Sequence, residues 1–236
     1  MSDNLEAPGT DDHPDWGSIY RARGPEVVSQ RPFFTGDVFR HVSIPGETEP
    51  IAVILVQHPC AIRTDGINLV PRLLAVEVQP ANPIPPSQWA SGYFKQMPLT
   101  ELVPEGKPSH YAAIFTKPLI TTPSALDAAE RVACLSQSGV NLLLQRWVHH
   151  NSRAVVSTQL YQGVSSAQYE EADLIEDWCI EREDDGIAMA AAAEEANTWL
   201  SRAAISNESN RDLLKSPQHR SAVRKAMRTY LAEVRR

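Results

Sequence analysis

The stretch that decides the fold is residues 36–79, GDVFRHVSIPGETEPIAVILVQHPCAIRTDGINLVPRLLAVEVQ, which contains three strand-like runs joined by short connections. In the first run, residues 38–44, apolar and polar side chains alternate, as they do in a half-buried strand. The second run, residues 51–56, is apolar throughout and rich in β-branched side chains, which indicates a central strand covered on both faces. The third run, residues 73–78, precedes Pro80, which we expect to stop the strand.

Strand patterns continue after this stretch and then give way to helical ones. Residues 93–97 and 110–115 have strand-like patterns, and five short strands without long helices between them favour a small antiparallel barrel. From Pro123 onward apolar side chains recur at helical spacing. The second half predicts one more strand, at 153–157, and helices at 124–135, 136–148, 169–182, 188–204 and 217–236.

The predicted fold class is therefore α+β, with a small antiparallel β-barrel followed by a helical C-terminal region. Three parts are expected along the chain. Residues 1–30 form a disordered acidic arm, residues 31–160 a β-barrel domain with packed helices, and residues 161–236 a helical extension that ends in a basic amphipathic helix.

Composition excludes some classes of function. The net charge of −7 argues against charge-driven, nonspecific binding to nucleic acid or to an anionic membrane. Three widely spaced cysteines do not make a disulfide framework, and no run approaches the roughly 18 apolar residues of a membrane span. The acidic N-terminus has no apolar core of a signal peptide. We expect a soluble, cytoplasmic protein without membrane contact.

The charges are distributed unevenly along the chain. Residues 165–200 contain eleven acids and one basic side chain, whereas residues 209–236 contain eight basic side chains and two acids. A basic amphipathic helix at 217–236 is typical either of a partner-docking helix or of a cationic cover over the acidic helix, and we weigh these equally. As a docking helix it would bind a protein partner, with direct nucleic-acid binding weak or absent, through Arg220, Arg224, Met227, Arg228, Tyr230 and Leu231.

A polar loop after the second run holds His58, Cys60, Arg63 and Asp65. His58 and Cys60 could form a metal-ligand pair or a Cys–His nucleophile, but only one cysteine stands in the loop, so a structural role is favoured and no metal or other cofactor is expected. Arg63, Asp65 and Arg72 could contact a phosphate. The favoured interpretation is instead a loop tied by an Arg–Asp pair.

The stretch RWVHH at residues 146–150 combines a cation, an aromatic ring and two imidazoles at a predicted helix end. One interpretation is a base-stacking site. The favoured one is structural, because Trp147 fits the apolar helix face and histidine is stabilised near a helix C-terminus by the helix dipole.

Part of the chain, roughly residues 35–150, resembles the MazF/PemK family of ribonuclease toxins. The resemblance lies in Gly36-Asp37-Val38, Ile51-Ala52-Val53-Ile54-Leu55, Leu73-Leu74-Ala75-Val76 and the predicted helix at 126–135. It implies a small SH3-like barrel. However, Glu49-Pro50 stands where the family has its catalytic Arg-Pro, and Val78-Gln79 where it has a Thr or Ser. Because RNA cleavage needs a cation to stabilise the developing phosphorane charge, a ribonuclease using Arg63, Arg72 and His58 is the alternative hypothesis.

In its overall charge and composition, and not in any motif, the chain also resembles accessory proteins of actinobacterial phages. Among these, the recombination directionality factors of serine integrases are large acidic proteins that bind the integrase and not DNA. The resemblance implies a non-enzymatic regulator that acts by protein–protein binding, with a DNA recombinase as the candidate partner. This is the preferred hypothesis from the sequence.

Overall fold

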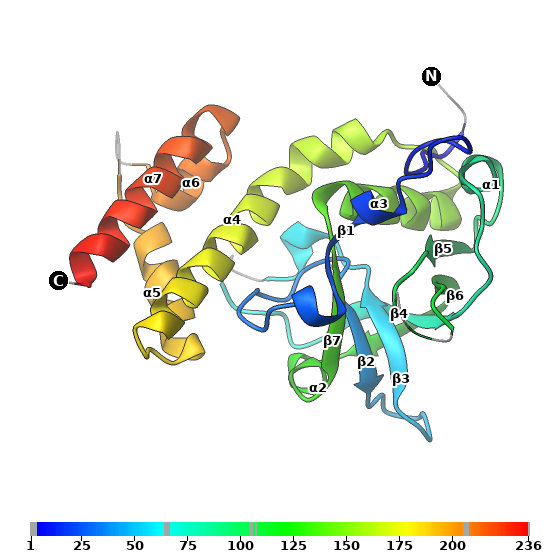
Figure 1. The fold of residues 1–236 in the computed structure, drawn as a ribbon, viewed down its shortest axis with the longest axis horizontal. Coiled ribbons are helices and arrows are strands. Elements are labelled where there is room, and N and C mark those ends of the chain that lie inside the picture. The colour runs from blue at the N-terminus through cyan, green and yellow to red at the C-terminus, as the bar shows by residue number, and fades with distance from the viewer. Residues whose placement is uncertain (1–3, 64–66, 104–105, 107, 205–207, 236) are drawn as a thin grey trace. The chain divides into compact units, whose positions relative to one another are not determined.

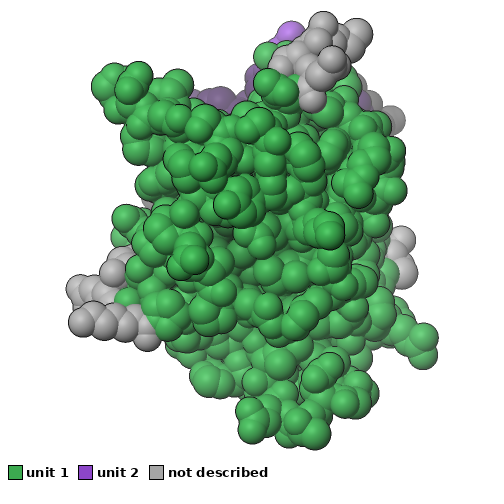
Figure 2. Space-filling view, turned by 90° about the vertical axis from the view of Figure 1, so that its right-hand side faces the viewer, with its two compact units in different colours: residues 1–27, 33–164 green, residues 28–32, 165–236 purple. Residues whose placement is uncertain are grey.

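The structure of the chain, a computed structural model, describes residues 4–63, 67–103, 106, 108–204 and 208–235. It divides into two compact units (Figure 2), one of residues 1–27 and 33–164 and the other of residues 28–32 and 165–236. The sequence predicts a domain boundary after residue 160, and in the structure the boundary between the two units falls after Val164. The fold class is α+β, as predicted.

Unit 1 contains a seven-stranded antiparallel sheet in the order β1-β7-β2-β3-β4-β6-β5, which is curled into a half-barrel (Figure 1). The strands are β1 Tyr20–Arg23, β2 Val38–Val42, β3 Ile51–Leu55, β4 Leu73–Pro80, β5 Gln96–Leu99, β6 Tyr111–Thr121 and β7 Glu130–Leu135. The helices of this unit are η1 Trp16–Ile19, η2 Gly24–Glu26, η3 Pro59–Ala61, α1 Pro86–Ser91, α2 Pro123–Asp127 and α3 Gln137–Ser152. A long helix, α4 Thr158–Asp184, begins in unit 1 and continues into unit 2.

The centre of the sheet is covered on both faces, as the apolar run at 51–56 predicts. Val53, Ile54 and Leu55 are all fully buried although neighbouring side chains of a strand point to opposite faces. Ile54 is the register partner of Val38 and of Val76, and it forms an apolar row with them across three strands. Because consecutive side chains of β3 point to opposite faces of the sheet, burying all of them removes apolar surface from water on both faces and stabilises the sheet.

Helix α3 lies across the open side of the half-barrel. It contacts β7, near one edge of the sheet, and β5, at the other edge. Its start agrees with the sequence, because Ser136 caps it by accepting a hydrogen bond from the backbone N–H of Gly139 at 3.1 Å. The two sheet edges are also tied by a side chain, since the Tyr20 hydroxyl of β1 donates to the carbonyl of Thr100, the residue after β5, at 3.1 Å.

Several elements differ from the sequence predictions, two of them at 130–135 and 153–157. Residues 130–135 were expected to continue a helix, but they form β7, which pairs with β2 and with β1. Helix α2 ends at Asp127, and Ala133 packs beside its register partner Val38, so tertiary strand pairing outweighs the helical propensity of this short segment. Residues 153–157 form no strand; Arg153 instead ends α3 with a left-handed backbone.

The N-terminal segment also differs from the disordered arm predicted for residues 1–30. Within it, η1 and β1 are regular structure, and Ile19 and Leu5 are buried. The Glu6 carboxylate accepts hydrogen bonds from the backbone N–H and from the hydroxyl of Thr158 at the start of α4, at 2.9 and 2.5 Å. Acidic composition suggested disorder, but a few apolar anchors and this helix-capping carboxylate order the segment. Residues 1–3 lie outside the described part of the chain.

Unit 2 is a helical cluster of α4, α5 Met189–Leu200, α6 Asn210–Leu214 and α7 Pro217–Val234. Its core contains Trp178, Trp199, Met227 and Leu231, among other buried apolar side chains. The guanidinium of Arg31 is buried and bonds Asp173 and Glu176 of α4 at 2.5 and 2.7 Å. In the parts of the chain that the structure describes, no helix is long and apolar enough to cross a membrane.

Candidate binding pocket

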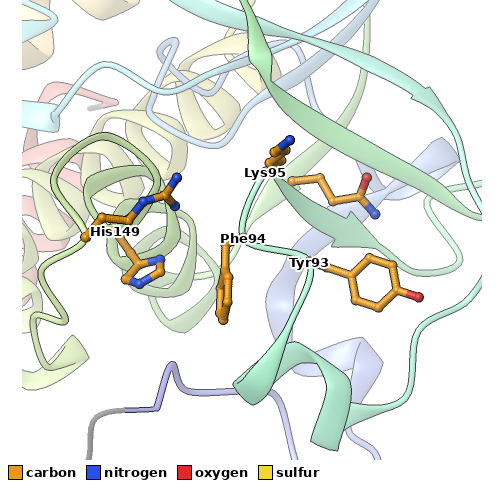
Figure 3. Close-up of a pocket in the computed structure, with 6 residues that line it drawn as sticks. Tyr93, Phe94, Lys95 and His149 are labelled. Atoms are coloured by element: carbon orange, nitrogen blue, oxygen red, sulfur yellow. The ribbon is translucent and has the colours of Figure 1, made fainter.

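A pocket of about 620 Å³ opens in unit 1 between the segment that leads into β5 and the C-terminal end of α3 (Figure 3). This volume lies in the range of small-molecule binding sites, about 300–1,000 Å³. The pocket is lined by Tyr93, Phe94, Lys95, Gln96, His149 and Arg153.

Arg146 of α3 holds the pocket wall in place. Its fully buried guanidinium donates hydrogen bonds to the carbonyl oxygens of Trp89, Gly92, Tyr93 and Gln96, at 2.7, 3.3, 2.9 and 3.1 Å. Burial lowers the pKa of Arg146 to about 10, so the group stays protonated at neutral pH. One buried cation thus fixes the backbone from α1 to β5 through carbonyl oxygens that would otherwise need water.

Two lining residues have a strained backbone. Tyr93 has a φ of 55° and Arg153 a φ of 63°, in the left-handed region that non-glycine residues rarely adopt. Such a conformation costs about 1 kcal/mol or more, and it persists where the surroundings fix it. Tyr93 is fixed by Arg146, and Arg153 by its own N–H, which donates to the carbonyl of His149 at 2.8 Å.

The pocket is cationic. Lys95 and Arg153 are exposed lining residues, and no carboxylate lines the pocket among the residues that the structure describes. Within that part of the chain, neither cation forms an ion pair with an acid. The two positive charges are therefore available to an anion from solution.

His149 adds a neutral imidazole to these charges. Its pKa is lowered below the usual 6.5, first by burial and then by the positive charges of Arg153, Arg146 and His150. Its Nδ1 is buried and has no hydrogen-bond partner among the described residues. The ring lies 4.8 Å from that of Phe94, tilted by 58°, and Figure 3 shows Phe94 between His149 and Tyr93.

Aromatic surface and positive charge therefore meet in one pocket. Tyr93 exposes 50% of its surface, although an aromatic side chain gains most stability when buried. This arrangement can hold a planar ring by stacking and an anionic group by ion pairing.

A second pocket, of about 310 Å³, lies between the N-terminal segment and the starts of α3 and α4. Its polar side chains already bond within the chain: Ser138 donates to the carbonyl of Ser18 at 3.0 Å, and Asn141 to Gln162 at 2.8 Å. It is a weaker candidate because its polar groups have partners.

The loop cluster predicted from the sequence has local hydrogen bonds. Nδ1 of His58 accepts from the backbone N–H of Cys60 at 3.2 Å, and the Cys60 thiol donates to the carbonyl of Val164 at 3.7 Å. Burial raises the pKa of Cys60 and lowers that of His58, which disfavours a thiolate–imidazolium pair. These contacts agree with a structural role.

The candidate cations of the ribonuclease alternative do not line the two pockets described above. Arg63 donates to the carbonyl of Phe33 at 3.1 Å, and Arg72 is exposed. Neither of them, nor His58, lines either of the two pockets. Asp65 lies outside the described residues, and so does the predicted Arg63–Asp65 pair. In the described part of the chain, no group of three or more His, Cys, Asp or Glu is placed to hold a metal.

Of the six predicted docking residues of α7, Met227 and Leu231 are buried inside unit 2, whereas the other four are half-buried or exposed. Met227 and Leu231 are each 1% exposed, and Tyr230 stacks on Trp178 with ring centroids 5.6 Å apart. Arg220 donates to the Ser166 hydroxyl at 2.9 Å. Arg228 is exposed.

The acidic α4 explains this placement. Arg224 pairs with Glu170 and Asp177 of α4 at 2.8 and 3.2 Å, and Arg235 pairs with Glu181 and Asp185 at 3.3 and 3.0 Å. Of the two interpretations weighed equally from the sequence, the cationic cover is the one found in the structure.

Sequence reasoning found only part of the pocket. Of the stretch at 146–150, His149 lines the pocket, whereas Arg146 is buried behind it and Trp147 packs on Phe115 at 5.5 Å. The sequence predicts a strand at 93–97, but residues 93–95, which line the pocket opposite α3, precede β5. The available signal was the run GYFK after α1, where two adjacent aromatics and a lysine follow a glycine.

Comparison of the chain with protein-family models, with curated proteins and with solved structures found no match in any of the three.

Proposed function

We propose that the chain is a non-enzymatic binding protein and that unit 1 holds a phosphate-bearing ligand in the pocket between β5 and α3. The observation that carries the proposal is the pair of cations, Lys95 and Arg153, in a pocket whose described lining has no carboxylate. In a chain of net charge −7, a site with this local charge is suited to an anion. Guanidinium and ammonium groups are the usual ligands of phosphate.

A binding role is preferred to the ribonuclease alternative because the residues of that alternative do not line the pocket. The cation and imidazole of the ribonuclease alternative, Arg63, Arg72 and His58, lie outside both pockets. A general acid and base must reach the same reacting atoms. The regulator role and its DNA-recombinase partner remain separate proposals, and they would require a surface other than the buried face of α7.

Calorimetric titration with phosphate-bearing compounds tests the proposal. The panel is pyrophosphate, a sugar phosphate and a nucleoside monophosphate. We expect at least one to bind saturably, and Lys95→Gln and Arg153→Gln each to weaken that binding about tenfold or more, because a charge-assisted hydrogen bond is lost.

Arg72→Gln is the matched control, since it removes the same charge from an exposed position of unit 1 that does not line the pocket. Its affinity should stay within twofold of the unaltered protein. The proposal is wrong if no compound binds at millimolar concentration, or if Arg72→Gln weakens binding as much as Arg153→Gln. Hydrolysis of the bound compound or of RNA would contradict the non-enzymatic part.

A further inference from the structure

We infer that the ligand of this pocket is a single nucleotide, with its base packed on the aromatic wall formed by Tyr93 and Phe94 and its phosphate between Lys95 and Arg153. The inference rests on the proposed function and names the chemical class of its ligand. It starts from the aromatic wall, which phosphate binding alone does not explain.

Tyr93 is the first argument for a planar ligand group. Its left-handed backbone is unfavourable for a bulky side chain, and half of its surface stays exposed, so its placement gains little from burial. The buried Arg146 nevertheless fixes this backbone by bonding the carbonyls of Gly92 and Tyr93. An exposed aromatic ring that lines a pocket, on a backbone fixed in this way, is suited to stack on a ring brought by a ligand.

Polar groups in the same pocket suit the edge of a base. Gln96 lines the pocket, and its side-chain amide offers a donor and an acceptor together. A base with ring nitrogens and exocyclic groups would satisfy this amide, whereas a sugar phosphate or pyrophosphate has no planar group to stack.

A single nucleotide fits better than a nucleic-acid strand. The volume of about 620 Å³ is that of a small-molecule site, and the lining provides only the two fully charged side chains named above among the described residues. A strand needs a track of cations along its backbone. The net charge of −7 repels such a polyanion but adds little cost for one nucleotide.

The test compares four kinds of probe by calorimetry: a nucleoside 5′-monophosphate for each of the four RNA bases, the matching nucleosides, inorganic phosphate, and a mixed-sequence RNA octamer. We expect at least one nucleotide to bind about tenfold or more tightly than inorganic phosphate and than its own nucleoside. The octamer should bind no more tightly than that nucleotide, at low or at moderate salt.

Variants of the aromatic wall then locate the base. Tyr93→Asn removes the ring and keeps a residue that tolerates the left-handed backbone, and Phe94→Leu keeps apolar bulk without an aromatic face. Each should weaken nucleotide binding about fivefold or more and leave phosphate binding within twofold, whereas Tyr93→Phe, which keeps the ring, should retain nucleotide affinity. Thermal unfolding of each variant checks that the fold is intact.

The outcomes separate this inference from the proposal beneath it. If inorganic phosphate binds as tightly as any nucleotide, and the ring variants have no effect, the pocket is a phosphate site and the nucleotide inference fails alone. If the octamer binds more tightly with a steep salt dependence, the ligand is a strand and the inference is again wrong. If no nucleotide binds but pyrophosphate or the sugar phosphate does, the inference again fails alone; if none of these compounds binds, the proposed function fails as well.

Discussion

At the scale of single residues, Arg146 is the side chain on which the pocket depends. A guanidinium offers five donors in a rigid fork, and in Arg146 these reach four backbone carbonyls of the segment from Trp89 to Gln96. No shorter or less branched side chain can replace it there. The sequence places this arginine in a possible base-stacking site, but in the structure its guanidinium is buried and holds the backbone that forms one wall of the pocket.

We expect Arg146→Gln to lower the free energy of unfolding by about 3 kcal/mol and to weaken ligand binding, because buried carbonyls lose a charged donor. Urea unfolding followed by tryptophan fluorescence measures the first effect. The control is Arg153→Gln, at an exposed position of the same helix end, which should change stability by only about 0.5 kcal/mol. An unchanged unfolding free energy in Arg146→Gln would contradict the structural role.

His149 makes stability depend on pH. Its folded-state pKa is lowered by burial and by nearby cations, so in the unfolded chain it takes up a proton at a higher pH than in the folded chain. Above about pH 7 His149 is neutral in both states and does not affect the free energy of unfolding. As the pH falls through 6.5 toward the lowered folded-state pKa, protonation of His149 in the unfolded chain lowers that free energy. His58, whose pKa is also lowered by burial, acts in the same direction.

We expect the unfolding free energy to fall between pH 7.5 and 5.5, with a slope of up to about 1.4 kcal/mol per pH unit for each histidine. His149→Gln should reduce this slope. Urea unfolding at pH 7.5, 6.5 and 5.5 gives the slopes of both proteins. Equal slopes would mean that the His149 pKa is the same in the folded and unfolded chains.

At the scale of elements, α7 shows how one amphipathic pattern is compatible with two roles. Its apolar side chains contribute to the core of unit 2 with Trp178 and Trp199, and its cations pair with the acids of α4. A docking helix and a core helix have the same periodicity. Only the presence of a complementary acidic helix within the unit distinguishes them.

We therefore expect Met227→Ala and Leu231→Ala each to destabilise unit 2 by about 2–5 kcal/mol, the cost of deleting a buried apolar side chain. Thermal unfolding by circular dichroism measures the change, with Arg228→Ala at an exposed position of α7 as the control. Were the apolar face a docking surface, both alanine variants would unfold like the unaltered protein.

At the scale of the whole molecule, the net charge and the distribution of charge along the sequence do not predict which cations line a pocket. The basic C-terminal segment suggests an outward-facing cationic element, but three of its arginines, Arg211, Arg224 and Arg235, pair with acids of α4 or with Asp185 just after it. The two cations of the pocket are instead Lys95, just before β5, and Arg153, just after α3, which lie far apart in the sequence. Their proximity follows from α3 lying across the half-barrel.

Elements with a local signal can be predicted from the amino-acid sequence. The alternating and continuous apolar runs place β2, β3 and β4 within a few residues, helical spacing after Ser136 places α3, alanine-rich composition places α5, and helical spacing after Pro217 places α7. These patterns depend on which side chains one strand or helix must bury, so they can be read without knowing the neighbours. The same reasoning led to the α+β class.

In contrast, β1, β7 and the pocket depend on contacts between segments that are distant in the sequence. Glu130–Leu135 becomes a strand because β2 and β1 provide partners on both sides, and the N-terminal segment is ordered because Glu6 meets the start of α4. The pocket requires Arg146 to bond carbonyl oxygens that are 50 to 57 residues away along the chain. Such contacts depend on distances in space, which local periodicity does not encode.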